Sequence, residues 1–181
     1  MFSGPCFPPP LIETERLILR GHVMADLPAC QRLWSDAAVV RYLGGRPFSQ
    51  EEVWMRLLRY AGGWAQLGFG FWLVETKDGR FVGEVGFHEL HRDTEPSFAG
   101  IPEVGWILAP EWHGKGVAGE AMTAALAWGD QHIDHPRFAC IIHPENAPSI
   151  RLGERLGFIF ETEIRYRDGR MRLSYRNRSK V

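Results

Sequence analysis

The spacing of apolar residues in the first third of the chain predicts one strand followed by two helices. Leu17 and Leu19 alternate with polar neighbours in ERLILR, a pattern typical of a half-buried strand. We expect a short helix in residues 25–34 and a longer one in residues 53–66, with a capping box formed by Ser49 and Glu52 ahead of the second. The residues expected on the buried face of the longer helix are Val53, Leu57, Leu58 and Ala61.

Three strands are predicted in the middle of the chain from runs rich in β-branched and aromatic residues. Residues 69–77 and 80–90 are joined by Asp78 and Gly79, the pair favoured in a two-residue type I′ turn, so these runs should pair antiparallel. The run EVGWILAP, residues 103–110, is apolar on both faces, which predicts a strand in the centre of a sheet.

The next part of the chain alternates helix and strand. Apolar and small residues recur with helical spacing in residues 116–132, which predicts an amphipathic helix. Residues 137–143 are typical of a buried strand. Asn146 is a favoured N-cap residue and Gly157 a favoured C-terminal stop, so we expect a further helix between them.

A hairpin completes the predicted elements. Residues 158–166 and 170–176 flank Asp168 and Gly169, again a favoured turn pair. The patterns together predict about four helices and about seven strands in one mixed α/β (α+β) domain. We place this domain at residues 11–177, after a proline-rich extended lead-in at residues 1–10.

Composition agrees with one domain and makes some partners unfavourable. The chain has 181 residues, and 45% of them are hydrophobic, which is enough for one core. Twenty-one basic and 22 acidic residues leave a net charge of −1, so no overall field attracts nucleic acid or an anionic membrane. We expect the basic residues Arg172, Arg176 and Arg178 to form a solvated edge.

The cysteines and the N-terminus favour a cytoplasmic location. Cys6, Cys30 and Cys140 are odd in number and widely spaced, which indicates neither a disulfide framework nor a metal-binding knuckle. We expect no metal. The first ten residues have no basic residue and no apolar core of a signal peptide.

A cluster of glycines, WHGKGVAGEA at residues 112–121, is the strongest chemical signal. Gly114, Gly116 and Gly119 lie between a predicted strand and a predicted helix, where free backbone N–H groups bind phosphate. Lys115 adds a positive charge. Two alternatives are close helix packing and the G-x-G-x-x-G motif of a nicotinamide-linked oxidoreductase, but the latter requires an early βαβ unit.

The order of elements and the run EVGWILAPEWHGKGVAGEAMTAAL resemble the GCN5-related N-acetyltransferase (GNAT) family, especially the branch of ribosomal-protein N-terminal (RimJ/RimL-type) acetyltransferases. The resemblance implies a GNAT fold with a mostly antiparallel sheet. It also implies that acetyl-CoA is the co-substrate and that backbone amides of the glycine loop hold its pyrophosphate. The loop residues concerned are His113, Gly114, Lys115, Gly116, Val117, Ala118 and Gly119, with His113 in place of the family's Arg or Gln.

A second landmark, NAPSIRLGERLGF, resembles the family's asparagine-initiated helix. The resemblance implies that Asn146 and Ser149 contact the coenzyme, although Asn146 is also a plain helix cap. Many members carry a tyrosine where this chain has Gly153, so Ser149 becomes the candidate for stabilising the departing thiolate. The backbone of Trp106, Ile107 and Leu108 is expected to hold the pantetheine amides and the thioester carbonyl.

The resemblance implies acetyl transfer to a primary amine, either a protein N-terminal α-amine or a small molecule, by direct attack within a ternary complex. Glu103 is the candidate base, and its alternative is a solvated charge at a strand end; His88 and Glu89 are reserves. Trp34, Trp54 and Trp64 either border the acceptor or belong to the core. A non-catalytic acyl-CoA-binding regulatory module is the alternative function, and a homodimer is left open.

Overall fold

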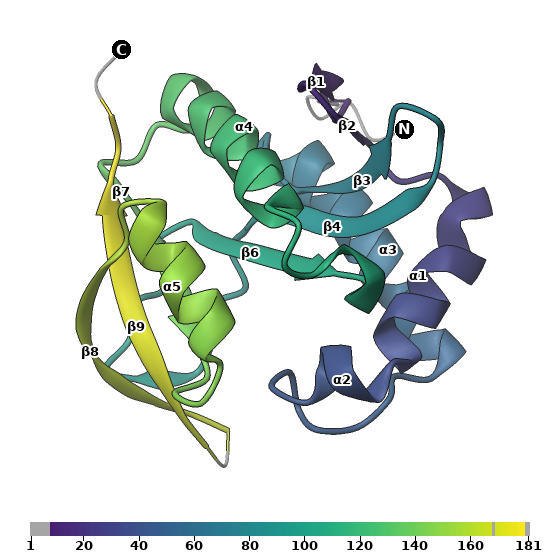
Figure 1. Cartoon of the computed structure of the whole chain (residues 1–181). Helices are drawn as coiled ribbons and strands as arrows, with labels where there is room; N and C mark the ends of the chain where they lie inside the picture. Colours follow the sequence, from purple (N-terminus) through teal and green to yellow (C-terminus); the bar gives the residue numbers. More distant parts are fainter. Residues whose placement is uncertain (1–7, 168, 180–181) are drawn as a thin grey trace, which may run out of the picture.

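The computed structural model describes residues 8–167 and 169–179, and its centre is one sheet of nine strands (Figure 1). The strands are β1 (Ile12–Glu13), β2 (Leu17–Arg20), β3 (Phe71–Thr76), β4 (Phe81–His88), β5 (Thr94–Glu95), β6 (Glu103–Leu108), β7 (Arg137–Ile142), β8 (Ile159–Tyr166) and β9 (Gly169–Asn177). Their order across the sheet is β1-β2-β3-β4-β6-β7-β9-β8-β5. All neighbours pair antiparallel except β6 and β7, which are parallel.

Five α-helices and two 3₁₀ turns cover the sheet (Figure 1). The helices are α1 (Leu27–Ser35), α2 (Ala37–Val40), α3 (Gln50–Leu67), α4 (Val117–His132) and α5 (Ala147–Arg155), and the 3₁₀ turns are η1 (Met24–Asp26) and η2 (Pro110–Trp112). One buried cluster joins α4 to the sheet, and a second joins α1 and α3 to its other face. Among the described residues, no helix is both long and apolar enough to cross a bilayer.

The mixed α/β fold is confirmed, but the element count was too low. The two added strands, β1 and β5, have two residues each and lie at or near the sheet edges. The added helix α2 has four residues and begins after Asp36, whose side chain accepts from the N–H groups of Ala38 and Val39. Elements this short carry no detectable periodicity in the sequence.

The buried face of α3 is only partly the predicted one. Ser49 and Glu52 form the expected capping box, and Val53 and Leu57 are buried. Leu58 is 43% exposed and Ala61 is also exposed, so the prediction for both was wrong. The buried face of α3 instead continues through Tyr60 and Trp64. The large aromatic rings of these two residues bury more area than Leu58 and Ala61 would.

The turn between β3 and β4 differs from the type I′ prediction. Gly79 donates its N–H to the carbonyl of Thr76 at 2.8 Å, so Lys77 and Asp78 are the central residues. Gly79 has φ of 81°, while Asp78 is not in the left-handed region that a type I′ turn requires. The antiparallel pairing of β8 with β9 is confirmed, and Asp168 in their turn lies outside the described residues.

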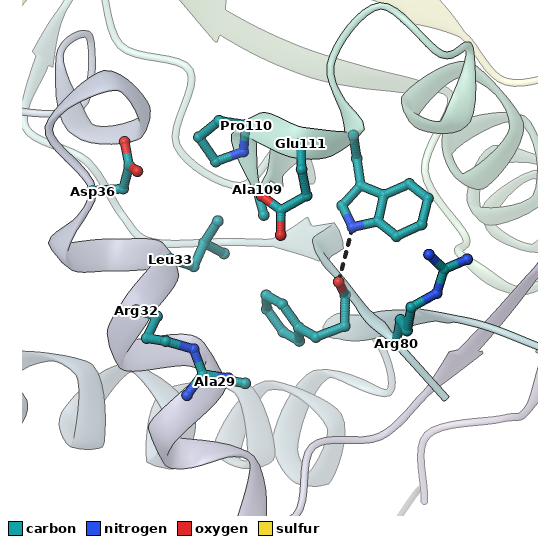
Figure 2. A pocket seen from close by; sticks show the side chains of 10 residues that line it. Ala29, Arg32, Leu33, Asp36, Arg80, Ala109, Pro110 and Glu111 are labelled. Carbon is teal, nitrogen blue, oxygen red and sulfur yellow. Dashed lines mark hydrogen bonds between the residues drawn. The ribbon is translucent and has the colours of Figure 1, made fainter. Parts of the chain in front are cut away.

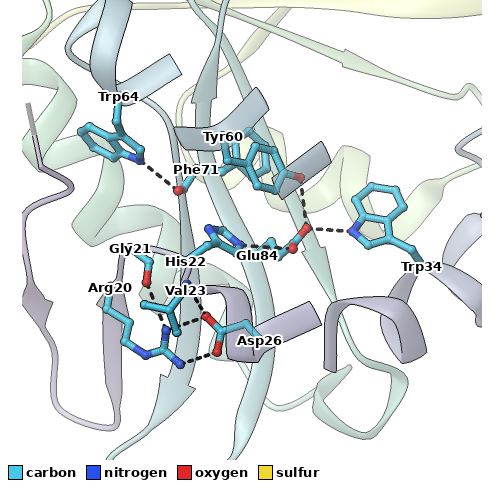
Figure 3. Close-up of polar contacts among 10 residues, drawn as sticks. All are labelled: Arg20, Gly21, His22, Val23, Asp26, Trp34, Tyr60, Trp64, Phe71 and Glu84. Atoms are coloured by element: carbon cyan, nitrogen blue, oxygen red, sulfur yellow. Dashed lines mark hydrogen bonds and ion pairs between the residues drawn. The ribbon is translucent and has the colours of Figure 1, made fainter. Parts of the chain in front are cut away.

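A buried carboxylate joins the sheet to the helices of one face (Figure 3). Glu84 of β4 is fully buried and accepts hydrogen bonds from the Trp34 indole at 2.8 Å and the Tyr60 hydroxyl at 3.0 Å. His22 Nε2 lies 3.2 Å from its other oxygen. Burial acts to raise the pKa of Glu84, but these hydrogen bonds hold it below its usual value. The carboxylate therefore stays charged and fixes α1 and α3 on β4.

The parallel neighbours β6 and β7 separate soon after they meet. Glu103 and Ala139 are their one registered pair, and Ala139 N also donates to the Pro102 carbonyl at 2.9 Å. Beyond this point β6 keeps β4 as a partner on one side only. Its residues Gly105 to Ile107 are half-buried although the strand is central. An opening between two strands is thus built into the sheet.

Candidate active site

The glycine loop runs from the end of β6 into α4 and leaves a set of backbone donors free. Gly114 and Gly116 have φ of 70° and 74°, and Gly116 is the N-cap of α4. The first bond of the helix runs from Glu120 N to the Gly116 carbonyl at 3.1 Å. Within residues 8–167 and 169–179, no acceptor is bonded to the N–H groups of residues 114–119. Such amides at a helix start, with the positive end of its dipole, can bind an anion.

An ion pair that the sequence analysis missed braces this loop. Arg16 donates to the carbonyl of Lys115 at 3.1 Å and to the carboxylate of Glu120 at 2.6 Å. Glu120 also accepts from the Arg16 N–H at 2.9 Å and from the Thr14 hydroxyl at 2.5 Å. The polar residues Thr14 and Arg16 just before β2 are the signal that could have indicated this contact. Their partner Glu120, however, lies 104 positions from Arg16 in the chain.

Side chains of the loop turn away from the helix start. His113 Nε2 lies 2.9 Å from the carbonyl oxygen of Leu108, which holds the ring against the end of β6. Lys115 Nζ lies 5.3 Å from the centre of the Trp112 ring. The departure at His113 therefore leaves the backbone amides of the loop accessible.

The predicted strand residues lie along the opening described above. Trp106, Ile107 and Leu108 pair with β4, and their other edge has no strand partner among the described residues. Unpaired N–H and C=O groups along such an edge can bind an extended chain that carries amides. These three residues form the end of β6 from which the chain continues into the glycine loop.

The helix α5 places Asn146 and Ser149 on the β7 side of the opening. Asn146 is the N-cap, and its Oδ1 accepts from the Ser149 N–H at 3.3 Å, so it does act as a helix cap. The Ser149 Oγ accepts from the indole Nε1–H of Trp106, also at 3.3 Å. A side chain of β6 and one of α5 therefore meet across the opening.

Glu103 lies where β6 and β7 meet, and it is 5% exposed. Arg92 binds both of its oxygens, with Nε–Oε2 at 2.5 Å and Nη2–Oε1 at 2.9 Å, and His88 Nε2 lies 3.1 Å from Oε1. Burial acts to raise the pKa of Glu103, but His88 and Arg92 outweigh it and hold it at about 2. Arg92 also donates to the Tyr166 hydroxyl at 2.6 Å. The alternative of a solvated strand-end charge is therefore wrong.

The reserve residues differ in their surroundings. His88 packs against Glu103; burial lowers its pKa and outweighs the raising effect of the Glu103 carboxylate. Glu89 pairs with the exposed His91 instead. Trp34 and Trp64 are core residues at 2% exposure, while Trp54 is 37% exposed.

The C-terminal arginines do not form a uniformly solvated edge. Both Arg176 Nη atoms bind the carboxylate of Asp130, at 2.8 and 2.7 Å, and the Arg176 side chain is 15% exposed. Arg178 Nε donates to the Asp130 carbonyl at 2.7 Å, and Arg172 lies over the ring of Phe160. The prediction was wrong for Arg176, because Asp130 on α4 supplies a buried partner.

A cavity of about 500 Å³ opens beside η2, on the α1 side of the sheet (Figure 2). Its polar lining residues include Arg32, Asp36, Arg80 and Glu111, and the Trp112 indole donates to the Phe81 carbonyl at its wall. None of the predicted site residues lines it. The cavity lies at the end of β6 opposite to Glu103, where the chain leaves the strand and enters η2.

One group of side chains among the described residues has the makings of a metal site. Ligand atoms of His22, Cys30 and Glu84 lie within 4.8 Å of one another. The Glu84 oxygens already face three polar side chains, and burial raises the pKa of the Cys30 thiol, which disfavours the thiolate that binds metals. The expectation that the protein uses no metal stays a prediction.

The fold and the free amides at the start of α4 are those of a protein that can hold a phosphorylated co-substrate at an open strand edge. A family model described as "Acetyltransferase (GNAT) domain" matches residues 16–159. The chain therefore belongs to the GNAT acetyltransferase family and is an acyl-CoA-dependent acetyltransferase. This finding overturns the nicotinamide-linked alternative.

Curated relatives and solved structures agree with this assignment. The chain is 28% identical over 156 residues to the uncharacterized N-acetyltransferase p20 of Bacillus licheniformis, with 85% of each chain covered. A solved structure from Bordetella pertussis, assigned to the same family, matches with a TM-score of 0.80 and 32% identity over 92% of this chain and 99% of that one. RimL, a ribosomal-protein alpha-N-acetyltransferase solved with coenzyme A, matches with a TM-score of 0.75 over 93% of this chain and 98% of its own, and at 18% identity it shows the fold.

Proposed function

We propose that this protein transfers an acetyl group from acetyl-CoA to a primary amine by direct attack within a ternary complex. The observation that supports it most is the meeting of two sets of free backbone groups at one place. The amides of residues 114–119 start α4, and the unpaired edge of β6 leads away from them toward Glu103. Coenzyme A has a pyrophosphate joined to an amide-containing arm. The pyrophosphate would bind the loop amides, and the arm would lie along the edge of β6.

In this proposal the loop from His113 to Gly119 holds the pyrophosphate, with Lys115 as a nearby positive charge. The pantetheine arm lies along Trp106, Ile107 and Leu108 in the opening between β6 and β7. Asn146 caps α5 through its Oδ1, so in this proposal its side-chain N–H groups donate to the coenzyme. The acetyl group then lies near Glu103, at the point where β6 and β7 meet.

The reaction forms a C–N bond between the amine and the thioester carbonyl carbon, and it breaks the C–S bond with the electron pair going to sulfur. A backbone N–H of β6 aimed at the developing oxyanion is worth about 2.7 to 4 kcal/mol. The amine must be neutral to attack. For an α-amine with pKa ~8 this costs about 1.4 kcal/mol at pH 7, and for a lysine with pKa ~10.4 about 4.6 kcal/mol.

The environment of Glu103 argues against the role of general base that the sequence analysis gave it. Moving a proton from an ammonium of pKa ~8 to a carboxylate of pKa about 2 is uphill by about 6 units, or about 8 kcal/mol. Deprotonation to water costs less. We assign Glu103 instead to stabilising the positive charge that develops on the attacking nitrogen, a role that its permanent negative charge suits.

The proposed acceptor class follows from the free-energy cost of deprotonating the amine without a strong base. Since no side chain that the structure describes at the meeting point of β6 and β7 is a strong base, acceptors that are largely neutral near pH 8 are favoured. α-Amines of peptides meet that condition better than lysine side chains. We therefore propose a peptide N-terminus or a small-molecule amine of similar pKa as the acceptor.

Initial-rate kinetics tests direct attack. With acetyl-CoA and an α-amino peptide varied together, a ternary complex gives double-reciprocal lines that intersect. Parallel lines, with an acetylated enzyme detected by mass spectrometry, would show a covalent intermediate and refute the proposed mechanism.

A further inference from the structure

The position where many family members carry a tyrosine is bordered by side chains of β6 and β7 in this protein. An ideal Cβ on Gly153 would lie 3.8 Å from Cη2 of Trp106 and 3.5 Å from Cδ1 of Ile142. The cavity beside Gly153 has a volume of about 20 Å³, room for one water and not for a phenol ring. The aromatic side chain at this place therefore comes from β6 instead of α5.

The polar end of that ring reaches the candidate for thiolate stabilisation. Trp106 Nε1–H lies 3.3 Å from the Ser149 Oγ. An indole N–H can only donate, so the serine oxygen is the acceptor of this bond. The hydroxyl has one proton of its own, and within residues 8–167 and 169–179 no group accepts it. The bond from Trp106 thus leaves that proton free for a ligand.

The Trp106 and Ser149 side chains meet on the face of the sheet that α4 covers. Side chains alternate along a strand, so Trp106 projects to the face opposite Glu103, and Ser149 is the residue of α5 that it meets. The ring is half-buried and packs against the cluster that includes α4. Packing on one side and the hydroxyl on the other restrict the indole to this orientation.

We propose that Trp106 is a positioning residue that aims the Ser149 hydroxyl at the thiolate of coenzyme A. The inference rests on the function proposed above. As the C–S bond breaks, its electron pair stays on sulfur, and the Ser149 O–H donates a hydrogen bond to it. The proton of the attacking amine goes to solvent. A thiol with pKa near 8.5 is a good enough leaving group that hydrogen bonding suffices without full proton transfer.

The test uses Trp106→Phe, which keeps an aromatic ring and removes the N–H, together with Ser149→Ala and the double variant. Trp128→Phe is the matched control, because that indole N–H has no hydrogen-bond partner among the described residues. The first readout is the pKa of the coenzyme A thiol bound to each variant. It is measured from the ultraviolet absorbance of the thiolate as the pH is varied. This readout needs neither acceptor nor turnover.

We expect the bound thiol pKa to rise by up to about one unit in Trp106→Phe and in Ser149→Ala, and no further in the double variant, with Trp128→Phe unchanged. Where amine-dependent turnover is measured, kcat should fall by about two- to tenfold in each single variant, with the KM for acetyl-CoA within about twofold. Adding Trp106→Phe to Ser149→Ala should have no further effect, because Trp106 acts on the thiolate only through the Ser149 hydroxyl.

An unchanged thiol pKa in Trp106→Phe, or additive effects in the double variant, would overturn the inference, since packing alone acts independently of the hydroxyl. If Trp106→Phe fails to fold, Ser149→Ala against Ser149→Thr decides, because threonine keeps the hydroxyl. Equal pKa values for those two would overturn it as well. Absence of turnover in the unmodified protein would instead count against the proposed function and leave the thiol measurement valid.

Discussion

Replacing Gly116 with aspartate tests the phosphate site most selectively. Gly116 is the N-cap of α4 with φ of 74°, a conformation that aspartate and asparagine tolerate better than most residues. A Cβ there meets only the Arg16 Nη2, at 3.7 Å. The new carboxylate would accept hydrogen bonds from the first turn of the helix, as a natural N-cap does. The variant should therefore fold while a negative charge occupies the place of the pyrophosphate.

The expected loss follows from Coulomb repulsion. Two unit negative charges about 4 Å apart repel by about 4 kcal/mol at an effective dielectric constant of about 20. Arg16 and salt screening reduce this value, because the Arg16 side chain is half exposed and close to the substituted position. We expect the affinity for coenzyme A to fall by at least about 100-fold, which corresponds to about 2.7 kcal/mol.

Titration calorimetry with coenzyme A measures this loss, and Gly116→Asn is the matched control. Asparagine has the same shape and caps the same amides without a charge, so it should cost less than about tenfold. A melting curve for each variant establishes that α4 has formed. Equal affinities for the aspartate variant and the unmodified protein would refute the assignment of pyrophosphate to this helix start.

Three further predictions concern stability and the brace of the loop. The pKa of Glu103 is lowered from 4.5 to about 2, so its contribution, about 3 kcal/mol, is present above pH 4.5 and is lost as the pH falls through 2; urea unfolding should show a smaller loss between pH 7 and pH 3 in Glu103→Gln than in the unmodified protein, and the loss that remains comes from carboxylates such as Glu84 and Asp130. Gly129→Ala places a Cβ 2.4 Å from Cζ of the buried Phe87 and should lower the unfolding free energy by about 1 to 3 kcal/mol, whereas Gly62→Ala, with nothing within 4 Å, should leave it unchanged or raise it. Arg16→Ala should weaken coenzyme A binding by about tenfold in calorimetry, and an unchanged affinity would remove Arg16 from the site.

Local sequence patterns predicted the elements that we propose to hold the coenzyme. The glycine loop, the N-cap at Asn146 and the apolar run of β6 each depend on residues close together in the chain, so their geometry can be inferred from short segments. The pairing of Trp106 with Ser149 and the brace from Arg16 to Glu120 join residues 43 and 104 positions apart. Such contacts depend on how the elements pack, which periodicity does not encode.

The role of Glu103 likewise depends on a contact that local sequence patterns do not predict. Its position at the start of a central strand was predictable, but its partner Arg92 lies in the segment between β4 and β6, which carries no clear pattern. The bidentate contact with Arg92 decides whether the carboxylate is a base or a fixed charge. The prediction of a type I′ turn at Asp78 and Gly79 was wrong for a related reason, since a dipeptide preference does not determine the length of a loop.

The release of coenzyme A thiol from acetyl-CoA, measured with and without amines, tests whether this protein transfers acetyl groups to amines. The panel should include α-amino peptides, polyamines and aminoglycosides, each at pH 7 and pH 8. The account predicts release only when acetyl-CoA and an amine are both present, with the higher rate at pH 8. Tight coenzyme A binding without amine-dependent release across the panel would contradict it and favour a non-catalytic acyl-CoA-binding module.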